Sequence, residues 1–174
     1  LFQDIIETTL RNPLIIGVTL VVLAAVLVAA EWTARREKEL NQISLTDALV
    51  IGCSQALALI PGVSRSGITI TSGLFRGLRR ETAARFSFLL STPIIAGAGA
   101  VEGLKIAKNG IPLELIPGFL LGMAVAAAVG YITIAFLLRY LTSHNTYVFV
   151  WYRVILGVVV FMTFADRKST RLNS

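Results

Sequence analysis

The feature that most constrains this chain is a set of long apolar blocks with almost no charge. Residues 13–30 read PLIIGVTLVVLAAVLVAA and end beside an interfacial pair, Glu31-Trp32, and residues 115–138 carry no charge at all. A transmembrane helix needs about 20 mostly apolar residues, whereas soluble domains space their apolar residues at helical or strand intervals. The chain is 55% hydrophobic and 15% charged, against about 25% charged residues in soluble domains. The sequence therefore predicts a membrane protein and excludes a soluble enzyme, a disulfide scaffold and a disordered tail.

Four segments are apolar and long enough to be predicted as spanning helices. They are residues 13–30, 86–104, 115–138 and 147–165. The second is the least regular, because Pro93 interrupts it and Glu102 lies near its end. The predicted fold class is thus an all-α, polytopic integral membrane protein.

The last predicted span contains a charged residue, Arg153. An arginine inside a span is costly and usually faces the protein interior or a polar cavity. Alternatively, the span begins late and Arg153 extends to the headgroups, as the neighbouring interfacial residues Trp151 and Tyr152 would allow. The sequence alone leaves both interpretations open.

Residues 45–78 form a fifth apolar region of a different kind. The stretches 48–64 and 66–75 are uncharged, but Pro61-Gly62 and Arg65 interrupt them. Proline cannot continue a helix, and the freed backbone groups need polar partners within a membrane. Two arms joined by a polar turn, the second too short to span, predict a re-entrant helical hairpin at about residues 45–78. Broken helices of this kind place their ends at buried polar sites.

The basic residues indicate orientation rather than nucleic-acid binding. The net charge is +6, but a nucleic-acid groove would leave the apolar blocks unexplained. Three Lys and Arg lie in residues 31–47 and four in residues 76–85, against two in residues 105–114. A re-entrant hairpin puts the first two loops on one face, and their seven basic residues make that face cytoplasmic.

The hairpin turn has the chemistry of an anion site. Pro61 ends one helix, Gly62 lets the chain turn, and Ser64 or Ser66 can cap the next helix. The free amides and positive dipole of a helix N-terminus favour an anion. Arg65 adds a planar charged group that matches phosphate oxygens.

An ordinary surface turn is the alternative interpretation, since serine, glycine and proline are common in turns. A surface turn would not need long apolar arms, however, and an arginine between them costs several kcal/mol without an anionic partner. The phosphate interpretation is therefore favoured, with Ser64, Ser66 and Thr69 as further donors.

The remaining reactive side chains are few. The lone Cys53 lies in an apolar run, where a buried side chain is expected. His144 lies in a polar loop, and one cysteine and one histidine cannot form a metal site of the usual spacing.

At these residues the chain resembles the undecaprenyl-diphosphate phosphatases, also called bacitracin-resistance proteins. The string PGVSRSGIT at residues 61–69, preceded by CSQALA at residues 53–58, is closely similar to their signature. The likeness covers nearly the whole chain. Further matching positions are Ser87, Phe88, Leu89, Leu90, Pro93, Tyr152 and Arg153.

The resemblance implies a bacterial plasma-membrane enzyme that removes one phosphate from undecaprenyl diphosphate. This reaction recycles the lipid carrier of cell-wall synthesis, and so bears on cell shape and antibiotic resistance. The fold implied is two inverted repeats, each with a re-entrant hairpin, whose tips meet at a site reached from the outer face. The implied partners are the polyprenyl diphosphate lipid and the bilayer, with a homodimer left open and no nucleic acid.

The resemblance also assigns residues. Arg65 matches the family's essential phosphate-binding arginine and Ser64 the serine beside it, so both are expected to be catalytic. Ser66, Gly67 and Thr69 match the rest of the motif and are expected to bind phosphate.

Two more residues are expected to give polar support. Gln55 falls where the other repeat carries a glutamate, and Arg153 is the charged residue of the last span. Whether Ser64 attacks the phosphate or only donates a hydrogen bond is left open.

The family's first repeat, with its glutamate-rich segment and histidine, has no counterpart here. Residues 1–166 are therefore interpreted as the C-terminal part of a membrane phosphatase, inactive alone, and the start at Leu1 rather than methionine agrees with this. Residues 167–174 are a polar tail, either a solvated end or a non-native extension. A divalent cation, magnesium or calcium, is implied as cofactor, with no metal ligands in this part.

A transporter and a structural membrane subunit are the alternative functions. Inverted repeats with broken helices also build secondary transporters, so the same phosphate cradle could serve a polyprenyl-phosphate flippase. A purely structural membrane subunit would leave Arg65 unexplained.

Overall fold

The computed structural model describes the backbone of residues 13–110 and 112–172, and this part of the chain is helical with no β-strand. The elements are α2 (Pro13–Thr33), η1 (Leu40–Gln42), α3 (Leu45–Ser54), η2 (Gln55–Leu59), α4 (Arg65–Phe75), α5 (Arg80–Asn109), η3 (Leu113–Leu115), α6 (Ile116–Ser143) and α7 (Tyr147–Leu172).

Four helical segments are long and apolar enough to cross a membrane: Pro13–Thr33, Arg80–Asn109, Leu113–Ser143 and Tyr147–Phe164. Each contains or closely matches one predicted span. The second is longer than residues 86–104 because α5 begins at Arg80 and continues through Pro93. The prediction of an all-α, multi-pass membrane protein is confirmed.

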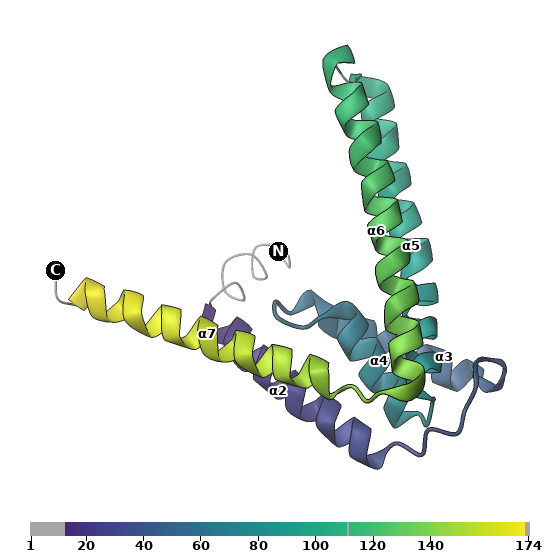
Figure 1. Ribbon diagram of the computed structural model, residues 1–174, viewed down its shortest axis with the longest axis vertical. Coiled ribbons are helices and arrows are strands. Elements are labelled where there is room, and N and C mark those ends of the chain that lie inside the picture. Colours follow the sequence, from purple (N-terminus) through teal and green to yellow (C-terminus); the bar gives the residue numbers. More distant parts are fainter. Residues whose placement is uncertain (1–12, 111, 173–174) are drawn as a thin grey trace.

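The spanning helices form two arms that meet at a corner (Figure 1). Helices α2 and α7 lie side by side in one arm and α5 and α6 in the other, with the α3–α4 hairpin at the corner. Small residues bring α2 and α7 together: the Phe161 ring packs on Gly17 and the Val21 side chain on Gly157, each 3.0 Å from where a Cβ would lie. Such close approach is how membrane helices gain packing energy.

The two ends of the hairpin lie together, as the predicted topology requires. The amides of Glu37 and Lys38 each donate to the Gly77 carbonyl at 3.0 Å, and the Arg79 amide donates to the Lys38 carbonyl at 3.1 Å. The loops before and after the hairpin therefore share one basic face. The α3–α4 segment has the shape of the predicted hairpin, with its turn between Leu59 and Arg65.

Asp47 fixes the base of this hairpin. Its carboxylate is fully buried and accepts from Lys38 Nζ at 2.9 Å and from Arg76 Nε at 2.7 Å, so it joins both ends of the hairpin. The Ser44 side chain caps α3 by accepting from the Asp47 amide at 3.1 Å. Lys38, together with Arg76 and Ser44, holds the pKa of Asp47 well below its usual range, against the opposing effect of burial.

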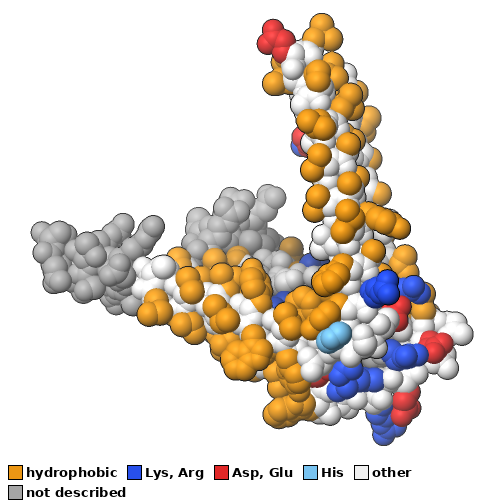
Figure 2. All heavy atoms as spheres, viewed as in Figure 1, with side chains coloured by type: hydrophobic (Ala, Val, Ile, Leu, Met, Phe, Trp, Pro, Cys, Tyr) orange, Lys and Arg blue, Asp and Glu red, His pale blue; other side chains and the backbone are white. Residues whose placement is uncertain are grey.

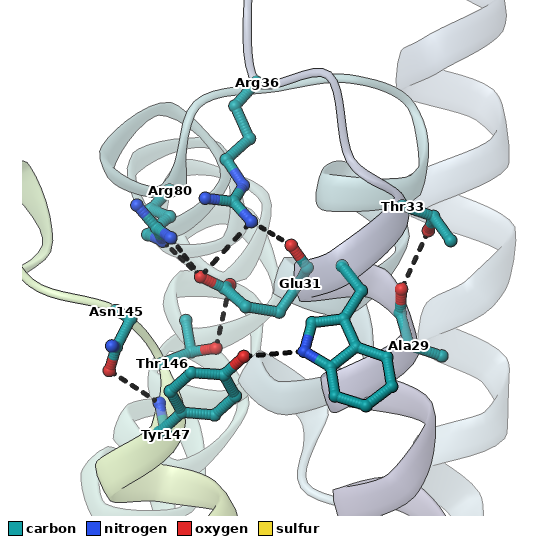
Figure 3. Close-up of polar contacts among 9 residues, drawn as sticks. Ala29, Glu31, Thr33, Arg36, Arg80, Asn145, Thr146 and Tyr147 are labelled. Atoms are coloured by element: carbon teal, nitrogen blue, oxygen red, sulfur yellow. Dashed lines mark hydrogen bonds and ion pairs between the residues drawn. The ribbon is translucent and has the colours of Figure 1, made fainter.

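A second buried carboxylate, Glu31, joins the two arms (Figure 3). It accepts from Arg80 Nε of α5 at 2.6 Å and from Thr146 Oγ1 beside α7 at 3.0 Å. The Arg36 guanidinium lies 3.7 Å from the same carboxylate. Glu31 is 1% exposed, and these donors satisfy its buried carboxylate. Its neighbour Trp32 is 76% exposed, as an interfacial residue should be. The interfacial depth predicted for Glu31 and Trp32 stays a prediction.

The charged side chains gather where the arms meet, while the arms themselves present mainly hydrophobic side chains (Figure 2). No residue in the most apolar window of the third spanning segment is buried. Leu121, Ile132 and Phe136 of α6, for example, are 66%, 65% and 70% exposed. Such apolar surface on a chain of this composition belongs in a bilayer or against other membrane helices.

Candidate phosphate-binding site

The turn of the hairpin leaves a helix N-terminus with free donors. Ile60 is extended, and Gly62 has φ of 89°, a left-handed conformation that glycine adopts without strain. Ser64 then caps α4, because its hydroxyl accepts from the Gly67 amide at 3.2 Å. Of the two predicted caps, Ser64 is the one observed.

Several donors converge at the first turn of α4. The Ser64 and Ser66 hydroxyls lie 3.3 Å apart, and Ser64 is exposed. Among the described residues, the amides of Arg65 and Ser66 donate to no backbone carbonyl. Free amides at a helix N-terminus form a site for an anion.

Arg153 of α7 completes this group. Its guanidinium lies against Gly67, so close that a Cβ at position 67 would overlap it. Arg153 is 8% exposed, and no acidic residue in the described part of the chain pairs with it. Of the two interpretations left open, the interior one is therefore correct. Arg153 faces the hairpin, while Trp151 and Tyr152 are 66% and 64% exposed.

The serines and Arg153 line a pocket of about 210 Å³ whose remaining wall is mainly apolar. Its lining residues are Leu20, Leu27, Ser64, Ser66, Gly67, Ile70, Leu137, Leu141, Thr146, Phe149, Tyr152 and Arg153. A site with convergent polar groups and apolar walls is typical of ligand binding. Here it suits an anionic head with a hydrocarbon attached.

Arg65 stands beside this pocket rather than in its lining. Its side chain is half-buried, and within the described residues no hydrogen bond or ion pair involves its guanidinium. Arg65 is thus unpaired, like Arg153, and both cations adjoin the same turn.

Thr69 lies on a different side of α4. It is 1% exposed, and its hydroxyl contacts the Arg65 carbonyl at 2.9 Å and Ser87 Oγ of α5 at 2.6 Å. A hydroxyl has one proton, so these contacts engage Thr69 in packing α4 on α5. Its donation to a phosphate stays a prediction.

Gln55 begins η2 on the other arm of the hairpin and does not line the pocket. Its Oε1 atom is buried, and no donor in the described part of the chain reaches it. Cys53 is exposed, so the expectation of a buried cysteine was wrong. It lies on a helix whose outer face no described element covers.

The described residues contain no group of three or more His, Cys, Asp or Glu side chains that could hold a metal ion. His144 follows α6 and stacks on Tyr140, with ring centroids 4.3 Å apart.

Sequence reasoning missed one residue at this site, Thr19 of α2. Its hydroxyl donates to the Pro61 carbonyl at 2.8 Å, directly at the hairpin turn. A single threonine inside an apolar span gives no signal of its own, because only the folded arrangement reveals its partner.

Comparisons with known proteins agree with this picture. The family model described as bacitracin resistance protein BacA matches residues 1–159. Three relatives carry the name undecaprenyl-diphosphatase. That of Pelotomaculum thermopropionicum is 48% identical over 97% of this chain and 62% of its own length. That of Desulforudis audaxviator is 49% identical over 91% of this chain and 59% of its own length. That of Thermodesulfovibrio yellowstonii is 49% identical over 96% of this chain and 64% of its own length. The chain therefore spans about three fifths of the length of these relatives.

Proposed function

The chain belongs to the bacitracin resistance protein BacA family, and we propose that it supplies the phosphate-binding part of an enzyme that hydrolyses undecaprenyl diphosphate. The products are undecaprenyl phosphate and inorganic phosphate, so the reaction recycles the cell-wall lipid carrier. The names of the relatives support this reaction class.

The observation that carries the proposal is the buried, unpaired Arg153 beside the capped turn of α4. Burying a guanidinium without a counter-charge costs several kcal/mol. A phosphate bound between Arg153 and the donors of Ser64 and Ser66 would remove this cost through charge-assisted hydrogen bonds. Arg65, on the same turn and also unpaired, would add a second cation.

In the proposed reaction, water attacks the terminal phosphorus while the bond to the bridging oxygen breaks. The electron pair of that bond stays with undecaprenyl phosphate, and the attacking water loses a proton. Negative charge spreads over the oxygens of the moving phosphoryl group, so fixed donors and cations stabilise the transition state. Arg153, Arg65 and the amides of α4 serve this role, and Ser64, already accepting from Gly67, can donate its own proton to the phosphate.

The prenyl chain would lie along the apolar wall of the pocket, against residues such as Ile70, Leu137 and Phe149. Leu27 and Leu74 are buried in one core cluster and offer almost no surface to a lipid.

The attacking water also needs a base, and the reaction as implied by the resemblance needs a divalent cation. We propose that both come from the part of the relatives that this chain does not cover, and that the chain alone is inactive. The proposed site is reached from the outer face, because the basic loops lie at the opposite end of the hairpin from its turn.

The test is phosphate release from undecaprenyl diphosphate in detergent. The protein is a chimera that joins this chain to the unmatched part of the Pelotomaculum thermopropionicum relative. We expect release by the chimera, none by the chain alone, and loss in Arg153→Ala. Arg139→Ala is the matched control, because Arg139 is exposed at the end of α6. Loss of phosphate release with a chelator, and its recovery with magnesium or calcium, would support the proposed divalent cation.

Two results would overturn the proposal. One is full release by Arg153→Ala, which would remove the observation on which the site depends. The other is absence of release by the chimera together with transfer of labelled undecaprenyl phosphate across vesicles, which would identify a transporter.

A further inference from the structure

We propose that Thr19 of α2 is a positioning residue that holds the phosphate-binding turn in place. The inference rests on the proposed function, since it concerns the same turn. It assigns a role to a helix that contributes no group of its own to the phosphate.

A side-chain hydrogen bond joins α2 to the turn. Thr19 Oγ1 donates to the Pro61 carbonyl at 2.8 Å, with the Ile16 carbonyl of its own helix at 3.0 Å as the competing acceptor. In a continuous helix the Pro61 carbonyl would accept from the amide of Arg65, four residues on. The break at the turn removes this partner, and a carbonyl within a membrane needs another donor. Thr19 supplies it, and the Arg65 amide stays free for an anion.

The turn is also tightly packed at Gly62. Gly62 lies so close to α2 that a Cβ there would overlap Thr19 Oγ1 and lie 2.9 Å from the Ile16 carbonyl oxygen. The backbone of the turn therefore rests directly on α2. Any side chain at position 62 would push it away, and its φ of 89° already favours glycine.

The turn is held from two sides. Thr19 contacts it from α2, and Arg153 contacts Gly67 from α7. These two helices pack closely through Gly17 and Gly157, which lie within about one helical turn of Thr19 and Arg153. The rigid packing of α2 on α7 thus sets the distance between Thr19, which anchors the turn, and Arg153, the phosphate-binding cation.

The experiment measures the exposure of the turn without needing catalysis. In the chimera, Cys53→Ser removes the native thiol and Val63→Cys places a thiol in the turn, where a water-soluble maleimide reports its exposure. Thr19→Val keeps the shape but removes the donor, and Thr19→Ser keeps the donor. The matched control is Thr33→Val on the same helix, whose hydroxyl bonds only to its own helix, at Ala29.

We expect Thr19→Val to raise the labelling rate about fivefold, the factor that one net hydrogen bond represents. Thr19→Ser and Thr33→Val should stay within about twofold of the parent. For phosphate release, we expect Thr19→Val to lower kcat about tenfold with little change in KM, because the phosphate binds but is misaligned. Thr19→Ser should restore kcat.

An unchanged labelling rate in Thr19→Val would contradict the proposal that Thr19 anchors the turn. So would a Thr19→Ser variant that is labelled as fast as Thr19→Val. Normal kcat in Thr19→Val despite faster labelling would overturn its role in positioning. A labelling response as expected, with no phosphate release by the parent chimera, would instead overturn the proposed function and leave the anchor standing.

Discussion

Arg153 of α7 packs on the α-carbon of Gly67 in the first turn of α4, and the guanidinium occupies the space where a side chain at position 67 would begin. The position of the Arg153 guanidinium therefore depends on Gly67 having no side chain. The same contact brings the charge next to the serines of the turn.

Replacing Gly67 with alanine should displace Arg153 and misplace the phosphate. We expect Gly67→Ala to lower phosphate release by the chimera about 100-fold, the loss that a displacement of about 1 Å produces. Gly130→Ala in α6 is the control, because no atom lies within 4 Å of a Cβ there. Equal activity of the two variants would contradict the close contact.

Arg65 should tolerate no substitution. We expect Arg65→Ala to abolish phosphate release and Arg65→Lys to fail nearly as badly, since lysine lacks the planar group that binds two phosphate oxygens. Ser66→Ala should cause a smaller loss, because it removes one donor among several. Steady-state assays of the three variants give the ranking, and near-normal turnover of Arg65→Lys would refute two-point binding.

Glu31 should contribute more to stability than an exposed glutamate with a similar partner. Glu31→Gln leaves Arg80 without its buried counter-charge, and we expect the free energy of unfolding to fall by about 3 kcal/mol. Glu39 pairs with Arg79, but the two side chains are 60% and 56% exposed, so Glu39→Gln should cost less than about 1 kcal/mol. Unfolding in SDS, followed by fluorescence of Trp32 beside Glu31, measures both, and equal losses would contradict the prediction.

Asp47 should make stability depend on pH. Its pKa is lowered in the folded protein, so its ion pairs stabilise the hairpin fully above the ordinary aspartate pKa of about 3.9. This contribution is lost as the pH falls through the lowered pKa. We expect Asp47→Asn to reduce the free energy of unfolding by about 2 kcal/mol at pH 7. Thermal unfolding from pH 7 to pH 3 should show the difference from the parent shrinking below about pH 4, and a constant difference would exclude this role.

The parts of the fold that depend on local sequence could be predicted. Long apolar blocks identified the four spanning helices, and Pro61-Gly62 identified the break in the hairpin. The predicted re-entrant hairpin put its two ends on one face, and the Lys38 amide donates to the Gly77 carbonyl there.

The parts of the fold and the site that depend on contacts between distant segments could not be predicted from the sequence. The sequence left Arg153 divided between the interior and the headgroups, because only the packing of α7 on α4 decides which way its side chain points. The sequence predicted no partner for Glu31, because Arg80 lies 49 positions along the chain. Thr19 gave no signal for the same reason, since Pro61 is 42 positions away.

The pairing of α2 with α7 through Gly17 and Gly157 also bears on the order of assembly in the cell. A ribosome makes α2 and the hairpin well before α7, so the turn can rest on Thr19 while the opposite side is still empty. Arg153 reaches Gly67 only when α7 enters the membrane. The anion site is therefore completed by a spanning helix that is inserted after the hairpin, and until then the hairpin has no cation from α7 with which to bind a phosphate.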